Sequence, residues 1–235
     1  MEKYITIEND FFEILIPDSI KDYGNEVIKY STDKLEEFLH FFKVKSYGKK
    51  IKGSFFISSE DFFNRIKKLA PEASPPSWAK GCFYGGETQI LLNPQNIYER
   101  FCTLAHESFH LLFQKFIYEK NNMDRIVWLY ESLAGNFDGT TEKLIENGKF
   151  LEIVFNLKCN QKLPKMNDLE FSKGNIKTEN YNGYDLFKVV GRYLIETKSK
   201  DELLEYVNDK SKIVNDGNII LEASIKYFSE KYDIK

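Results

Sequence analysis

The sequence predicts an α+β protein in which a mixed sheet with helices forms the N-terminal part and helices dominate the C-terminal part. Short runs rich in β-branched and aromatic residues, separated by Asn, Asp, Gly and Pro, are concentrated within residues 4–92. Apolar residues at three- and four-residue spacing, which are typical of helices, prevail after residue 97. We therefore expect two lobes, residues 1–118 and residues 119–235.

Strands and helices alternate in the N-terminal part. Residues 4–17 contain two β-rich runs on either side of Asn9 and Asp10, which is turn chemistry and predicts a hairpin. Ser58 followed by Asp61 resembles a capped helix start. The other elements expected here are a long helix over residues 19–42, a strand over 51–57, a helix from Ser58 to about residue 69, two short strands within 81–94 and a helix over 97–118.

The C-terminal part carries little strand signal. Ser199 and Glu202 form a capping-box pattern, which predicts a helix that begins directly after Ser199. Residues 150–156 are the exception, since their β-branched and aromatic content suggests a strand. The helices expected from periodicity cover residues 124–135, 140–147, 183–197, 200–208 and 218–231.

Composition excludes several classes of protein. With 42% hydrophobic and 15% aromatic residues, the chain of 235 residues can bury a sizeable core. The 33 basic and 36 acidic residues are spread along the chain, so we expect no nucleic-acid partner. No apolar run approaches the roughly 20 residues that span a membrane. Three cysteines without a CxxC pattern fit reduced thiols, and the protein is expected to be cytoplasmic if Met1 is its natural start.

The segment LAHESFHLLF contains an HExxH motif. His106 and His110 are one helical turn apart, so their rings project from the same face and can meet one metal ion. Neutral imidazoles are preferred zinc ligands, and Glu107 between them is placed to act on a water molecule as a base. The chain has only 3 histidines, so random placement would produce roughly 0.004 such motifs.

A catalytic zinc site needs a third protein ligand and one open position. The segment RIVWLYESLAG offers Glu131, which follows His110 on the next predicted helix, and a reversal between two antiparallel helices would bring it alongside the histidines. Asp138, two turns later, is the alternative ligand; otherwise it is a carboxylate that orients a ligand histidine or an ordinary solvated residue at the end of the helix. One zinc ion is the expected cofactor, although cobalt or manganese would suit the same ligands.

These segments resemble the gluzincin metallopeptidases, in particular the bacterial peptidase MA-like proteins. The resemblance lies in SWAKG with QILLNP at residues 77–94, TLAHESFHLL at 103–112 and WLYESLA at 128–134. It departs from the family pattern at Ser132, where a glycine usually follows the third ligand.

The resemblance implies a zincin-like fold with a cleft between an α/β upper lobe and a helical lower lobe. In such a fold the strand of Gln89, Ile90 and Leu91 would lie at the edge of the sheet and bind an extended peptide substrate by β-augmentation. Related aminopeptidases stabilise the oxyanion with a tyrosine from a C-terminal helix. Tyr184 matches that placement best, with Tyr181 as the alternative.

The function expected is therefore zinc-dependent peptide-bond hydrolysis, with a peptide or protein as the substrate. Glu87 in GGETQ is a candidate for binding a substrate amino group, which would make the enzyme an aminopeptidase, or is an ordinary turn residue. Two other interpretations remain: a catalytically silent zincin fold that binds a peptide or protein, and a regulatory protease of narrow specificity. The sequence leaves the cleavage preference and the oligomeric state open.

Overall fold

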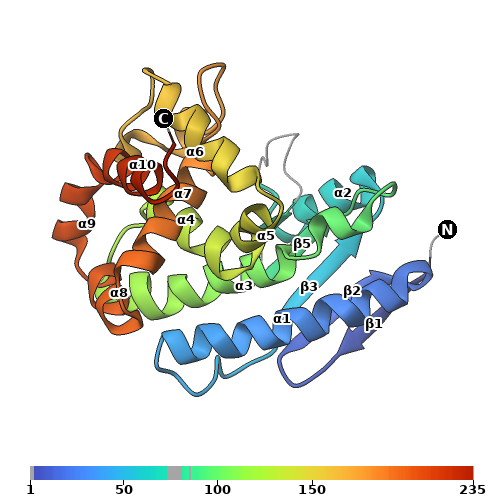
Figure 1. The fold of residues 1–235 in the computed structure, drawn as a ribbon. Coiled ribbons are helices and arrows are strands. Elements are labelled where there is room, and N and C mark those ends of the chain that lie inside the picture. Colours follow the sequence, from blue (N-terminus) through green and yellow to red (C-terminus); the bar gives the residue numbers. More distant parts are fainter. Residues whose placement is uncertain (1–2, 73–80, 85, 235) are drawn as a thin grey trace. The chain divides into compact units, whose positions relative to one another are not determined.

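The structure is a computed structural model that describes residues 3–72, 81–84 and 86–234. The chain divides into two compact units, Met1–Leu112 and Phe113–Lys235 (Figure 1). The described residues form ten α-helices and one five-stranded sheet, so the protein is α+β. Ser77 and Trp78 of the segment SWAKG lie outside the described residues.

The first unit is built on a mixed sheet with the strand order β1-β2-β3-β5-β4. The hairpin predicted for residues 4–17 is confirmed, because β1 and β2 pair in antiparallel fashion. The strand β3 lies parallel to β2 and to β5, and β4 folds back onto β5 as a second hairpin. The strands are β1 (Tyr4–Glu8), β2 (Phe12–Pro17), β3 (Ile51–Phe56), β4 (Gly81–Tyr84) and β5 (Glu87–Leu91).

Helices cover both faces of this sheet. In Figure 1 the long helix α1 (Lys21–Phe41) lies alongside the β1–β2 hairpin. A Cβ atom added to Gly24 of this helix would stand 2.8 Å from side-chain carbons of Ile7 and Ile16. Gly24 therefore lets the helix approach the hairpin and does not interrupt it. The opposite face packs against α2 (Ser59–Leu69), where Phe62 and Ile66 join Phe56 and Leu91 in a buried cluster. Ser58 caps α2 as predicted, since its hydroxyl accepts a hydrogen bond from the Asp61 amide.

The helix predicted for residues 97–118 consists of three segments. A 3-10 turn, η2 (Ile97–Arg100), precedes the α-helix α3 (Thr103–Phe113). A π-helical segment, η3 (Gln114–Glu119), then extends the chain into the second unit. Its Tyr118 hydroxyl donates to the carbonyl of Ile126 and accepts from the amide of the same residue, at 3.2 and 3.1 Å. Tyr118, the last residue but one of the π-helical segment, thus secures the start of the next helix.

The second unit is a helical assembly in which α4 (Val127–Phe137) and α7 (Gly183–Thr197) are neighbours. The capping box of Ser199 and Glu202 is confirmed at the start of α8 (Lys200–Val207). The strand predicted for residues 150–156 is wrong, because α6 (Lys149–Cys159) buries Phe150, Val154 and Leu157 at helical spacing. The remaining helices are α5 (Thr140–Glu146), α9 (Lys210–Asp216), which periodicity did not predict, and α10 (Ile220–Lys231). Within the described residues, no helix has both the length and the apolar character that crossing a bilayer requires.

An ion network joins α5, α7 and α10. Glu196 accepts hydrogen bonds from Arg192 at 2.7 Å, from Lys231 at 2.5 Å and from the Tyr227 hydroxyl at 3.1 Å. Arg192 also pairs with Glu142 at 2.7 Å. Burial favours the neutral acid, but the three donors outweigh it and hold the pKa of Glu196 below its ordinary value of 4.5.

We expect the second unit to lose stability in acid because of this network. A carboxylate with a lowered pKa stabilises the folded state above its ordinary pKa, and the contribution disappears as the pH falls through the folded value. Glu196→Gln is expected to cost about 1–3 kcal/mol of unfolding free energy near neutral pH. Denaturant unfolding of wild type and Glu196→Gln between pH 7 and pH 3 would measure the unfolding free energy of each. If both proteins lost the same unfolding free energy over this range, Glu196 would not be the source of the acid sensitivity.

Candidate metal centre

The HExxH motif lies on α3, and the packing of the first unit determines which face of that helix is buried. Leu104, Phe109 and Leu112 are fully buried, and Phe109 makes an edge contact with Phe38 of α1 at 5.1 Å between ring centroids. Burying side chains of this size contributes about 1.5–3 kcal/mol each, so this face anchors the helix. The Ser108 hydroxyl donates to the Leu104 carbonyl at 2.7 Å and is satisfied within the helix.

The motif residues occupy the other face of α3. His106 and Glu107 are half-buried, and His110 is 5% exposed. The rings of His106 and His110 stand edge to face with centroids 4.5 Å apart, which is the arrangement that the one-turn spacing predicts.

Glu107 lies against the outermost described strand of the sheet. A Cβ atom added to Gly81 of β4 would stand 3.2 Å from Glu107 Oε1 and 2.9 Å from Thr103 Cγ2. The next residue, Cys82, has its pKa raised to about 12 by burial and by the charge of Glu107. This thiol therefore stays protonated and is a poor metal ligand.

Glu131 is a buried residue of α4, 7% exposed. One potential ligand atom from each of His106, His110 and Glu131 lies within 4.8 Å of the others. Among the described residues, no other set of three His, Cys, Asp or Glu side chains has its potential ligand atoms this close together. Neither Asp138 nor Cys102 belongs to the group. The half-buried Cys102 instead directs its sulfur to the Tyr30 hydroxyl at 3.7 Å.

Asp138 lies at the C-terminal end of α4 and is 2% exposed, so it is not a solvated helix-end residue. Its carboxylate accepts a hydrogen bond of 2.6 Å from the Thr140 amide. That bond links the end of α4 to the start of α5 and is one reason for burying a carboxylate here.

The residues predicted to bind substrate are placed differently from the expectation. The strand β5 is an inner strand, because β3 pairs with one side of it and β4 with the other, so the prediction of an edge strand is wrong. Gln89, Ile90 and Leu91 are buried, with exposed fractions of 0%, 0% and 4%. Gln89 and Leu91 also face α2, on the side of the sheet opposite α3, since side chains alternate along a strand.

Glu87 is part of an ion pair and is not an isolated acid. Its carboxylate accepts from Arg65 of α2 at 2.6 Å and from Gln89 at 3.4 Å. A partner at this distance neutralises the charge that would attract a substrate amino group. The geometry therefore favours a structural role for Glu87.

The two tyrosines that were candidates for the oxyanion donor differ in their hydrogen bonds. The Tyr181 hydroxyl already donates to the Asn175 carbonyl at 3.0 Å. Tyr184 lies in the first turn of α7, and its ring contacts Phe187 and the ammonium group of Lys177.

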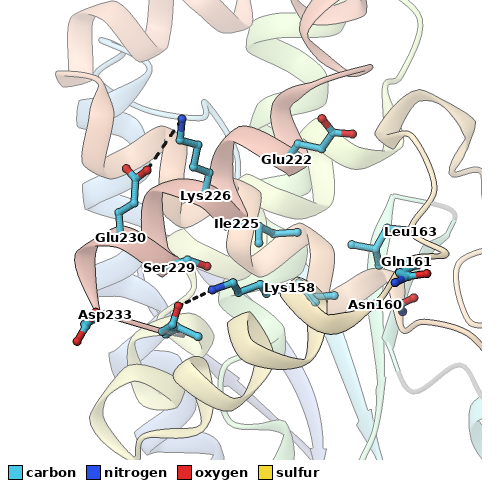
Figure 2. A pocket seen from close by; sticks show the side chains of 12 residues that line it. Lys158, Asn160, Gln161, Leu163, Glu222, Ile225, Lys226, Ser229, Glu230 and Asp233 are labelled. Carbon is cyan, nitrogen blue, oxygen red and sulfur yellow. Dashed lines mark hydrogen bonds and ion pairs between the residues drawn. The ribbon is translucent and has the colours of Figure 1, made fainter.

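A groove of about 670 Å³ lies in the second unit, between the end of α6 and α10. Figure 2 shows two interactions among its lining residues: Lys226 pairs with Glu230, and Lys158 donates to the backbone carbonyl of Ile234. The groove includes neither a residue of the HExxH motif nor Glu131, so we place the candidate metal site at the motif and not in this groove.

A scan of the chain against protein-family models gives no match, and a search of curated protein sequences also gives none.

Proposed function

We propose that the protein is a zinc-dependent metallopeptidase of the gluzincin type, in which His106, His110 and Glu131 hold the metal. The observation that carries the proposal is the approach of their ligand atoms to within 4.8 Å. A zincin-like fold is part of the same proposal. A mixed sheet with the HExxH helix packed on one face of it supports this assignment.

The donor set suits zinc. Two imidazoles and one carboxylate form a common catalytic ligand set, which leaves one position open. Ligand atoms of one tetrahedral zinc ion lie about 3.4 Å apart, so small side-chain rotations can close this group on an ion. A zinc ion held there would polarise the carbonyl group of a peptide bond and lower the pKa of a water molecule.

Glu107 supplies the proton transfers in this proposal. It is adjacent to His106 on α3, is half-buried, and its carboxylate faces β4. We assign it the acceptance of a proton from the attacking water and the delivery of that proton to the leaving amine.

In this proposal the substrate binds beside β4, and not beside β5 as the sequence had suggested. In the described sheet β4 is outermost, and only one of its sides pairs with a neighbouring strand. Its Gly81 touches the proposed base, so a peptide aligned with this strand would run past Glu107.

We predict that Gly81→Ala lowers kcat about tenfold while the metal is retained. The added methyl group would press on Thr103 and on the Glu107 carboxylate, and small misplacements of reacting groups cost large factors in rate. Steady-state kinetics with parallel zinc determination measure this. Adding Thr103→Ser removes the tighter contact and should restore part of the rate; no recovery in the double variant would argue against a steric cause.

Tyr184→Phe tests the oxyanion donor. The variant should lower kcat by about 10²-fold with little change in KM, because the donor acts on charge that develops in the transition state. Tyr181→Phe is the matched control and should leave kcat unchanged, since its hydroxyl is engaged with Asn175. Equal effects of the two variants would remove Tyr184 from this role.

Elemental analysis of the purified protein, combined with a peptide-library cleavage assay, tests the function itself. About one zinc per chain, with cleavage that a chelator abolishes and added zinc restores, is the expected result. A protein without bound metal even after incubation with zinc would refute the proposal. Stoichiometric zinc without cleavage of any library peptide would favour a silent fold that binds a peptide or protein, or a protease with a single substrate.

A further inference from the structure

The peptide group between Ser132 and Leu133, one residue beyond Glu131, lies against α7. A Cβ atom added to Gly191 would overlap the carbonyl group of Ser132, so no other residue leaves room for this approach. Ser132 itself is fully buried. The backbone of α4 at the proposed third ligand is therefore in close contact with the backbone of α7.

One side chain bridges the two helices at this point. The Asn136 amide nitrogen donates to the Ser132 carbonyl at 2.9 Å and to the Lys188 carbonyl at 3.1 Å. Both partners are acceptors, so the amide orientation is determined by chemistry. Carbonyl groups within α-helices already accept backbone hydrogen bonds, so these two need no further donor to be satisfied. The Asn136 bridge instead holds α4 at a fixed position and rotation against α7.

The first turn of α4 is secured separately. Ile126, which precedes the helix, bonds the Tyr118 hydroxyl through both its amide and its carbonyl. The indole of Trp128 donates to Asn167 at 3.2 Å. Glu131 thus lies between an anchored first turn and the Asn136 bridge, and both restrain rotation of α4 about its axis.

We propose that Asn136 is a positioning residue for Glu131, a role that rests on the proposed metal site. A carboxylate extends about 6 Å from the helix axis, so a rotation of about 10° displaces it by about 1 Å. Metal ligands tolerate only a few tenths of an ångström. Asn136 keeps Glu131 in register with the two histidines without contacting the metal.

The test compares zinc affinity in the full chain for wild type and Asn136→Asp, measured by competition with a chelator. Aspartate has nearly the same shape, but its carboxylate would face two carbonyl oxygens and repel them. We expect zinc affinity to fall about 10–100-fold, as when partners that orient metal ligands are removed elsewhere. We also expect a changed visible absorption spectrum of the cobalt(II)-loaded protein, which reports coordination geometry.

Two controls separate positioning from general destabilisation. Val154→Ala removes methyl groups from the fully buried core of the same unit and should lower Tm without changing zinc affinity or the cobalt spectrum. Gly135→Ala adds a methyl group to α4 where nothing lies within 4 Å, and it should leave the site unchanged. Gly191→Ala, which forces α4 and α7 apart, should reproduce the Asn136→Asp effect.

Wild-type zinc affinity and spectrum in Asn136→Asp would overturn the inference while leaving the metallopeptidase proposal intact. The inference also fails if Val154→Ala weakens zinc binding as much as Asn136→Asp does when the two variants have lost the same amount of Tm. If the wild type binds no metal, the proposed function fails and the positioning role falls with it. Should Asn136→Asp not fold, Asn136→Ala removes the donor without adding a charge and permits the same comparison.

Discussion

Replacing His110 or Glu131 by alanine is expected to abolish stoichiometric zinc binding. Both side chains are buried, so a water molecule that replaced one of them would have to enter a site 5–7% exposed to solvent. Removing a ligand should cost more than the 10–100-fold in affinity that the loss of an orienting partner costs. Chelator competition and elemental analysis measure the loss directly, and peptide cleavage should disappear with the metal.

Asp138→Ala is the matched control for the third ligand. Asp138 belongs to the same helix, is also buried, and was the alternative that the sequence left open. Its loss should reduce stability, because the hydrogen bond to Thr140 is removed, while zinc remains bound within about tenfold of wild-type affinity. Zinc retained in Glu131→Ala but lost in Asp138→Ala would reverse the assignment.

Glu107→Gln should reduce peptide hydrolysis by about 10³–10⁴-fold while zinc stays bound. Glutamine preserves the shape of the side chain but cannot accept the proton of the attacking water. Because Glu107 faces β4 and the metal is assigned to other residues, binding of metal and of substrate should persist. The loss should therefore appear in kcat, with KM nearly unchanged.

Ser108→Ala provides the control for Glu107→Gln. Ser108 is the next residue on α3, but it lies on the buried face, and its hydroxyl donates to the Leu104 carbonyl of the same helix. Its replacement should leave kcat within about twofold of wild type. Full activity in Glu107→Gln would mean that another group is the base, whereas loss of zinc in that variant would mean that Glu107 contributes to the metal site itself.

Local patterns predicted the local elements well. Ser58 and Ser199 cap the helices that follow them, because a capping hydrogen bond involves only residues three positions apart. The error at α6 has the opposite origin. Its aromatic and β-branched residues favour a strand by composition, but Phe150 and Val154 are one helical turn apart and are buried together. Packing against other helices of the unit outweighed intrinsic propensity.

The sequence alone determined that His106, Glu107 and His110 share one helical region, since helix geometry converts a spacing of four residues into a common face. Only the tertiary structure decided that β5 is an inner strand, that Glu131 and not Asp138 approaches the histidines, and that Asn136 bridges to α7. The physical reason is the range of the interactions. The hydrogen bonds of a helix fix the positions of residues one turn apart, so a local sequence pattern is enough to predict them. The pairing of strands and the contacts between helices depend on residues tens of positions away in the sequence, and a local pattern does not contain that information.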